Sequence, residues 1–195
     1  DTTGSRNGPA PATSTRRPSA SIAIPEAPAA HDGMTAFAPF VTRHQTQIRG
    51  QHIAYTATAG ETLLRNGRGQ PTAALFSFAY VKDDAPADRP VIFVFNGGPG
   101  SSSLWLHMGV VGPRRVQLDR EVNPSNVPPF GVVDNPDSLL DVADLVFIDP
   151  IGTGFSRIVG VGEPEDFYGV DQDAESVAQF IELWLSANGR WNAPK

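Results

Sequence analysis

Residues 96–103 read Asn-Gly-Gly-Pro-Gly-Ser-Ser-Ser and directly follow the apolar run Val91 to Phe95. Gly97 and Gly98 have no Cβ, so their backbone N–H groups can approach a ligand closely. The serines open a segment that we expect to be helical, and N–H groups at the start of a helix favour a developing negative charge. The loop is therefore a candidate oxyanion hole for acyl transfer, or else a tight strand-to-helix turn, and the residues alone leave both interpretations open.

Other chemistries of glycine-rich loops need residues that are absent here. A P-loop ends in Lys-Ser or Lys-Thr and a dinucleotide fingerprint reads G-x-G-x-x-G, and residues 97–103 match neither pattern. Ser101, Ser102 and Ser103 are nucleophiles by residue type, but the chain contains no G-x-S-x-G and no S-x-x-K. We therefore expect these serines to cap a helix or to pack.

Composition excludes several classes of function. The chain has no cysteine, so disulfides, thiolate metal sites and a cysteine nucleophile are excluded. Its four histidines, at 31, 44, 52 and 107, have no metal-binding spacing, so we expect surface or core roles for them and no metal or other cofactor. The net charge of −6 and the lack of a Lys/Arg block predict no nucleic-acid partner and no membrane partner.

A second loop, residues 147–157, reads Phe-Ile-Asp-Pro-Ile-Gly-Thr-Gly-Phe-Ser-Arg. Asp149-Pro150 predicts a turn, and Gly152 and Gly154 permit unusual backbone angles. This loop also follows a buried strand, at the carboxyl end where α/β sheets place their ligands.

The remaining chain predicts the elements that position these loops. Residues 1–33 are rich in Ala, Pro, Ser and Thr and predict a disordered tail, whereas residues 34–195 predict one domain that the chain enters around Thr35–Val41. Residues 47–60 and 73–81 alternate loosely and predict a hairpin or meander at a sheet edge, with a turn at residues 65–71.

Two shorter apolar runs, Val91 to Phe95 and Asp144 to Ile148, are typical of central, parallel strands covered on both faces. The Pro- and Gly-rich residues 109–141 predict a mostly irregular excursion. Residues 171–189 predict a helix capped by Asp171, ended by Asn188-Gly189, and buried along Ala174, Val177, Ala178, Ile181, Trp184 and Leu185. The fold class is therefore α/β, with antiparallel N-terminal strands leading into a parallel core.

Together, the two loops resemble a known family. The run "NGGPGSSSL" after "VIFVF", the later Gly112-Pro113, and "NPDSLLDVADLVFIDPIGTGFS" from Asn135 to Ser156 are similar to the serine carboxypeptidase family of α/β-hydrolases. The resemblance implies hydrolysis of peptides from the C-terminus, in a mixed α/β-hydrolase sheet that is incomplete in this chain. It implies an oxyanion-hole N–H from Gly98, a grip on the substrate carboxylate by Asn96 and Gly97, and either a leaving-group pocket or a core role for Trp105.

This sequence departs from the family's pattern in several places. Ser101 stands where the family has a cysteine, Val110 replaces a glutamate, and Leu139 replaces a tryptophan. The family's nucleophile motif follows the helix that matches residues 171–185, so we expect the catalytic Ser, Asp and His beyond Lys195. We accordingly expect this chain to be inactive alone and to need the C-terminal part of the same enzyme as its partner, with a peptide as substrate.

Alternatives remain at this stage. Another α/β-hydrolase, such as a prolyl-iminopeptidase-like enzyme or an esterase, could carry a related loop, although Asn96 stands where the iminopeptidase loop has histidine. A non-catalytic binding module could keep both loops without a triad. The polar tail, the absence of an initial Met and the habit of the family favour a secreted or periplasmic location.

Overall fold

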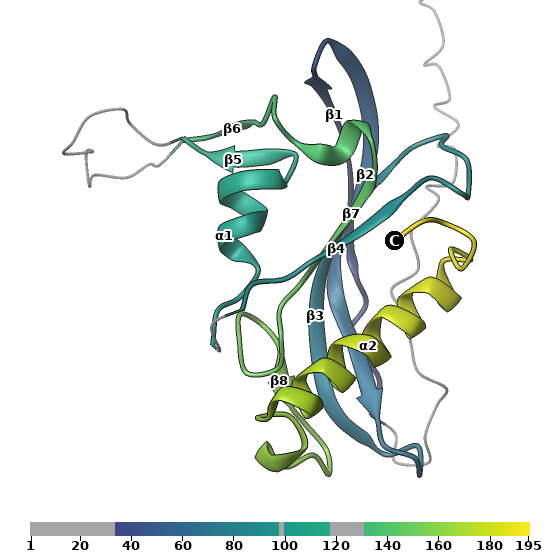
Figure 1. Ribbon diagram of the computed structural model, residues 1–195, viewed down its shortest axis with the longest axis vertical. Helices are drawn as coiled ribbons and strands as arrows, with labels where there is room; N and C mark the ends of the chain where they lie inside the picture. Colours follow the sequence, from purple (N-terminus) through teal and green to yellow (C-terminus); the bar gives the residue numbers. More distant parts are fainter. Residues whose placement is uncertain (1–33, 98–99, 118–130) are drawn as a thin grey trace, which may run out of the picture.

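The computed structural model describes residues 34–97, 100–117 and 131–195 (Figure 1). The expected tail, residues 1–33, and Gly98 lie outside these ranges. Among the described residues, one six-stranded mixed sheet has the order β1-β2-β3-β7-β4, and β8 pairs with β3. The strands are β1 (Phe40–Ile48), β2 (Gln51–Arg65), β3 (Pro71–Lys82), β4 (Val91–Val94), β7 (Asp144–Ile148) and β8 (Arg157–Ile158).

The first two strands correct the prediction of a single strand at residues 47–60. β1 ends at Ile48, and β2 begins at Gln51 and continues to Arg65. Between them Arg49 and Gly50 have φ angles of 46° and 78° and form a two-residue hairpin turn. The alternation was loose because it spans this turn. Arginine is not a residue type typical of turns, so the positive φ of Arg49 could not be predicted from the sequence.

The strand predicted at residues 73–81 is confirmed as β3, and the predicted turn at residues 65–71 separates it from β2. With β1 and β2 it forms an antiparallel meander at one edge of the sheet, as predicted. β1 is the outermost strand of this meander, and β3 joins it to the parallel pair by pairing with β7.

The parallel pair at the heart of the prediction is confirmed. β4 and β7 run parallel, with Val91 opposite Asp144. All five residues of β7 are buried, and successive side chains enter cores on opposite faces: Val146 and Ile148 on one, Leu145 and Phe147 on the other. β4 was expected to be central, but it is the last strand in the order of the described sheet.

Helix α2 (Val170–Ala187) packs across one face of the sheet (Figure 1). Gly169, rather than Asp171, is its N-cap residue, and Asp171 lies in the first turn. The buried face includes Phe180, whereas Ala174 and Ala178 of the predicted face are exposed. Gly189, with φ of 63°, follows the helix as expected. In the described part of the chain, no helix combines the length and apolarity required to cross a membrane.

The described part of the segment after the first loop has a shorter α-helix and more regular secondary structure than predicted. Helix α1 (Leu104–Leu106) is a single turn that continues as a π-helical turn, His107–Val111. The described parts of residues 109–141 contain an antiparallel strand pair, β5 (Arg114–Val116) with β6 (Val132–Asp134), and a 3₁₀ turn, Leu139–Asp141, so these parts are not mostly irregular. For residues 118–130, which lie outside the described ranges, the expectation stays a prediction. Leu106 and Val111 pack on the sheet face opposite to α2.

A buried ionic cluster joins the amino ends of β4 and β7 to the last described residues. The Asp144 carboxylate binds Arg89 Nε at 3.0 Å and Arg190 Nη1 at 2.7 Å, and it also accepts from the Lys82 backbone N–H. Next to this cluster, the Val91 N–H donates to the Pro194 carbonyl oxygen at 2.9 Å. Residues 190–194 therefore begin to line the outer edge of β4.

Candidate active site

The two loops predicted to carry chemistry meet in one pocket. They follow β4 and β7, and the carboxyl ends of parallel strands lie at the same edge of a sheet. The pocket has a volume of about 690 Å³. It is lined by Asn96, Gly97, Gly100 and Ser101, by residues 150–153, and by residues 167–170 with Asp173. Among the described residues, no three His, Asp or Glu side chains gather as a metal site.

Asn96 is oriented as a donor within this pocket. Its Oδ1 accepts a 3.4 Å hydrogen bond from the Leu106 backbone N–H, which turns the carbonyl end of the amide toward α1. The Nδ2 group is then the end with which Asn96 can bind an anion, since an amide N–H₂ donates and a carboxylate accepts. Gly97 lines the same pocket and has open space where a Cβ would stand.

The other residues predicted for the site are not among the described residues that line this pocket. Gly98 lies outside the described residues, so its expected N–H donor stays a prediction. Trp105 lies on α1 with 70% of its surface exposed, and it does not line the pocket, so both of its expected roles stay predictions. Of the two roles expected for the serines, capping or packing, Ser103 has the second: it is fully buried, makes no side-chain cap and binds Asp149.

Asp149 connects the two loops, whereas the sequence predicted only a turn at this residue. Its Oδ1 accepts hydrogen bonds from Ser103 N at 2.9 Å and from Ser103 Oγ at 2.8 Å, and its Oδ2 accepts from Phe155 N at 3.3 Å. The carboxylate is only 3% exposed. An acidic residue directly after a fully buried strand was the one signal available, because such a carboxylate must be hydrogen-bonded where it lies.

Gly154 leaves room for this carboxylate, and Ser156 fixes the backbone of Asp149. Gly154 has a φ of 52°, and a Cβ at this position would lie 2.0 Å from Asp149 Oδ2. Ser156 Oγ donates to the Asp149 carbonyl oxygen at 2.6 Å and accepts from Phe76 N on β3 at 2.7 Å. The second loop is therefore tied to the sheet as well as to the first loop.

Behind the first loop, His107 forms a buried pair with Tyr80. Its Nε2 lies 2.5 Å from the Tyr80 hydroxyl, and its ring stacks on Phe147 at a centroid distance of 4.4 Å. Burial lowers the pKa of His107 to about 4, against a smaller opposing effect of Asp149, and burial raises the pKa of Tyr80. The imidazole is thus neutral at pH 7, and the core role expected for a histidine is confirmed here.

The His107 environment predicts a loss of stability in acid. The unfolded chain binds a proton near pH 6.5, whereas the folded chain binds it only near pH 4, so the free energy of unfolding falls as pH decreases between these values. We expect a slope of up to about 1.4 kcal/mol per pH unit in urea unfolding. His107→Gln should flatten this slope, whereas exposed His52→Gln should leave it. An unchanged slope in His107→Gln would show that other groups dominate.

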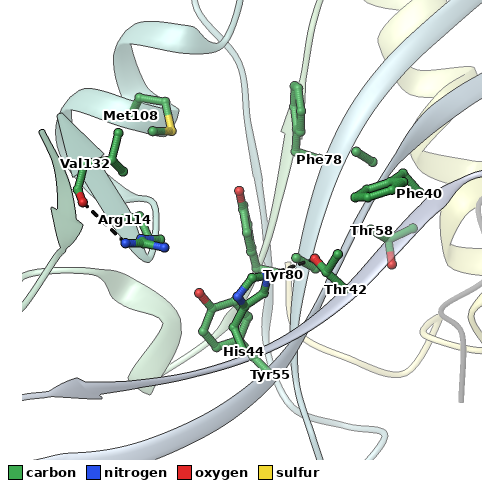
Figure 2. Close-up of a pocket in the computed structure, with 12 residues that line it drawn as sticks. Phe40, Thr42, His44, Tyr55, Thr58, Phe78, Tyr80, Met108, Arg114 and Val132 are labelled. Carbon is green, nitrogen blue, oxygen red and sulfur yellow. Dashed lines mark hydrogen bonds between the residues drawn. The ribbon is translucent and has the colours of Figure 1, made fainter. Parts of the chain in front are cut away.

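A second, smaller groove of about 230 Å³ lies on the sheet face opposite to α2, away from the loops (Figure 2). Figure 2 shows Tyr55, Tyr80 and His44 on its sheet side and Met108, Arg114 and Val132 across from them. The His44 ring stacks on Tyr55 at a centroid distance of 5.4 Å. The groove shares no lining residue with the pocket at the loops.

Comparison with known proteins accounts for both loops. Residues 64–193 match the family described as serine carboxypeptidase. The chain belongs to the serine carboxypeptidase family. Serine carboxypeptidase-like 12 of Arabidopsis thaliana is 28% identical over 131 residues, and the pheromone-processing carboxypeptidase KEX1 of Leptosphaeria maculans is 36% identical over 102 residues. These alignments cover 65% and 52% of this chain, but only 28% and 14% of those proteins.

Serine carboxypeptidases are hydrolases, and membership in this family confirms the resemblance that the sequence motifs indicated. The matched residues contain both loops and α2. Val110, which stands in place of the family's glutamate, is more than half exposed in the π-helical turn. Val110 does not line the pocket, to which the first loop presents the polar side chains of Asn96 and Ser101.

Proposed function

We propose that this chain is the N-terminal part of a serine-type carboxypeptidase with an α/β-hydrolase fold. One observation carries the proposal: the parallel pair β4 and β7 brings the glycine-rich loop and the second loop to one pocket. In that pocket Asn96 Nδ2 and the Gly97 backbone bind the C-terminal carboxylate of a peptide. The Gly98 N–H stabilises the oxyanion that forms on the penultimate carbonyl.

The proposed reaction is an acyl transfer followed by hydrolysis. A serine hydroxyl attacks the penultimate carbonyl carbon and transfers its proton to a histidine base. The base returns this proton to the leaving amine as the C–N bond breaks, and the C-terminal amino acid departs. Water then attacks the acyl-serine ester, and the peptide leaves shortened by one residue. Residues of this chain bind and orient, and they stabilise charge without forming a covalent bond.

We further propose that the nucleophile comes from sequence after Lys195. The chain contains no G-x-S-x-G, and it spans about 28% of the first relative named above. The hydrogen bond from Val91 N to the Pro194 carbonyl oxygen places the end of this chain beside the outer edge of β4. A parallel strand continued there completes the sheet and delivers its own carboxyl end to the pocket. The 195 residues alone are inactive.

The test of this function is the Asn96→Asp variant of the complete enzyme, assayed on N-blocked dipeptides. A carboxylate at position 96 replaces a donor with a like charge, so KM for substrates with a free C-terminal carboxylate should rise about 10- to 100-fold. KM for the matching C-terminal amides and esters should change less than about 3-fold. Asn66→Asp is the control, because Asn66 lies in the β2–β3 turn and does not line the pocket: its Oδ1 accepts from Arg68 N and Gln70 N, and its Nδ2 donates to Gln70 Oε1.

Each alternative has its own outcome in this assay. Cleavage restricted to peptides with a free α-amine would indicate an iminopeptidase-like enzyme, and cleavage of simple esters alone would indicate an esterase. Peptide binding without turnover by the complete protein would indicate a binding module. Any of these three results would overturn the carboxypeptidase proposal.

A further inference from the structure

The buried Asp149 carboxylate lies between the loop that carries the proposed oxyanion donor and the loop after β7. We propose that Asp149 is a positioning residue that holds the oxyanion-hole loop in its reactive geometry. The inference rests on the proposed function. Asp149 is absent from the lining of the pocket, so it acts on the reaction through the loop and not through contact with substrate.

The contacts of Asp149 converge on a single point of the first loop. Both the backbone N–H and the hydroxyl of Ser103 donate to the same oxygen, Oδ1, within 2.9 Å. Ser103 is the residue at which the loop enters α1, and it is completely buried. Hydrogen bonds to a buried charged acceptor are shorter and stronger than neutral ones, so this end of the loop has little freedom to move.

The other end of the loop is held separately. Asn96 Oδ1 accepts from Leu106 N, which closes residues 96–106 on themselves. This bond is long, at 3.4 Å, and it connects two residues of the same segment, so it does not fix the segment relative to the sheet. Asp149 connects Ser103 to the sheet directly, because its own position is set by β7 and by the Ser156 bridge to β3. The other contacts of this segment with the sheet, through Leu106 and His107, come later in the chain.

The arrangement has a direct consequence for catalysis. An oxyanion donor is effective only when its hydrogen bond is formed at about 2.7–3.1 Å to the charge that develops in the transition state. A displacement of about 1 Å caused by a distant substitution can reduce the rate about 100-fold. Loss of the Asp149 contacts should therefore lower kcat more than substrate affinity, since the ground state has no oxyanion and Asn96, which binds the substrate carboxylate, lies only two residues after the end of β4.

The experiment compares three variants of the complete enzyme. Asp149→Asn keeps one acceptor oxygen but places an N–H₂ group against a second donor, from Ser103 or Phe155. Ser103→Ala removes only the hydroxyl bond. Glu61→Gln is the matched control, because Glu61 is an equally buried carboxylate that binds Arg157 and the Phe37 N–H away from the first loop.

Three quantities are measured for each variant. kcat is normalised to active sites titrated with a fluorophosphonate, so that misfolded protein does not count. Affinity for a peptide boronic acid reports the tetrahedral, oxyanion-like state, and affinity for the product peptide reports ground-state binding. We expect Asp149→Asn to lower kcat and boronate affinity about 10- to 100-fold, with KM and product affinity within about 3-fold of wild type. Ser103→Ala should show a smaller loss in the same direction, and Glu61→Gln should show none.

The outcomes separate this inference from the function on which it rests. Normal kcat per active site in Asp149→Asn, or an equal loss of boronate and product affinity, would overturn the positioning role while leaving the carboxypeptidase proposal intact. A wild-type protein that takes up neither fluorophosphonate nor boronate would overturn both. A loss in Glu61→Gln as large as in Asp149→Asn would also refute the inference, because any buried carboxylate would then have the same effect.

Discussion

Asp144→Asn should lower the free energy of unfolding by about 3–5 kcal/mol, as expected when one member of a buried ion pair is removed. The substitution keeps the size of the side chain but leaves the Arg89 and Arg190 guanidinium groups buried without their shared counter-charge. Domain stabilities are typically about 5–15 kcal/mol, so the variant should be close to unfolding at 37 °C. Urea unfolding followed by circular dichroism measures the change.

A matched control is an exposed ion pair of the same type. Asp137 lies 3.4 Å from Arg115, and its side chain is 76% exposed. Asp137→Asn should change the free energy of unfolding by less than about 1 kcal/mol, because solvent screens the exposed pair. If the two variants were equally stable, the buried cluster would contribute no more than a surface pair, and its role in holding residues 190–194 against β4 would be wrong.

Gly154→Ala should cost about 3 kcal/mol of stability and should also disturb the loop after β7. Two effects add: alanine is strained by about 1 kcal/mol at a φ of 52°, and its Cβ would lie 2.0 Å from Asp149 Oδ2. The carboxylate must then move and loses charge-assisted hydrogen bonds, each worth about 1.5–3 kcal/mol. Thermal unfolding measures the stability, and the exchange rate of the Phe155 amide proton shows whether its bond to Asp149 is lost.

Gly69→Ala is the control that separates the cost of backbone strain from the cost of the steric clash with Asp149. Gly69 has a φ of 77°, but nothing lies within 4 Å of a Cβ built there, so only the conformational cost of about 1 kcal/mol should remain. An equal loss of stability in both glycine variants would mean that the Asp149 side chain moves aside freely. That result would also weaken the case for Asp149 as a fixed support.

Much of the fold followed from local patterns. The apolar runs at Val91 and Asp144 predicted a buried parallel pair, because only strands covered on both faces remain continuously apolar. The turn after Arg65 and the glycine after α2 were visible because glycine and proline act on the backbone locally. The boundary between β1 and β2 was not predicted, because Arg49 is not a typical turn residue. Arg49-Gly50 divided one expected strand into two, and Phe180 replaced Ala178 on the buried face of α2.

The sequence by itself determined the chemistry of this chain: a glycine-rich loop after one strand, a second loop after its parallel neighbour, and motifs selective enough to place it among serine carboxypeptidases. The tertiary structure decided which residues work together. Asp149 meets Ser103 across 46 positions, and Tyr80 meets His107 across 27. Such pairings depend on the order and pairing of strands, which are set by long-range contacts that no local window of sequence contains.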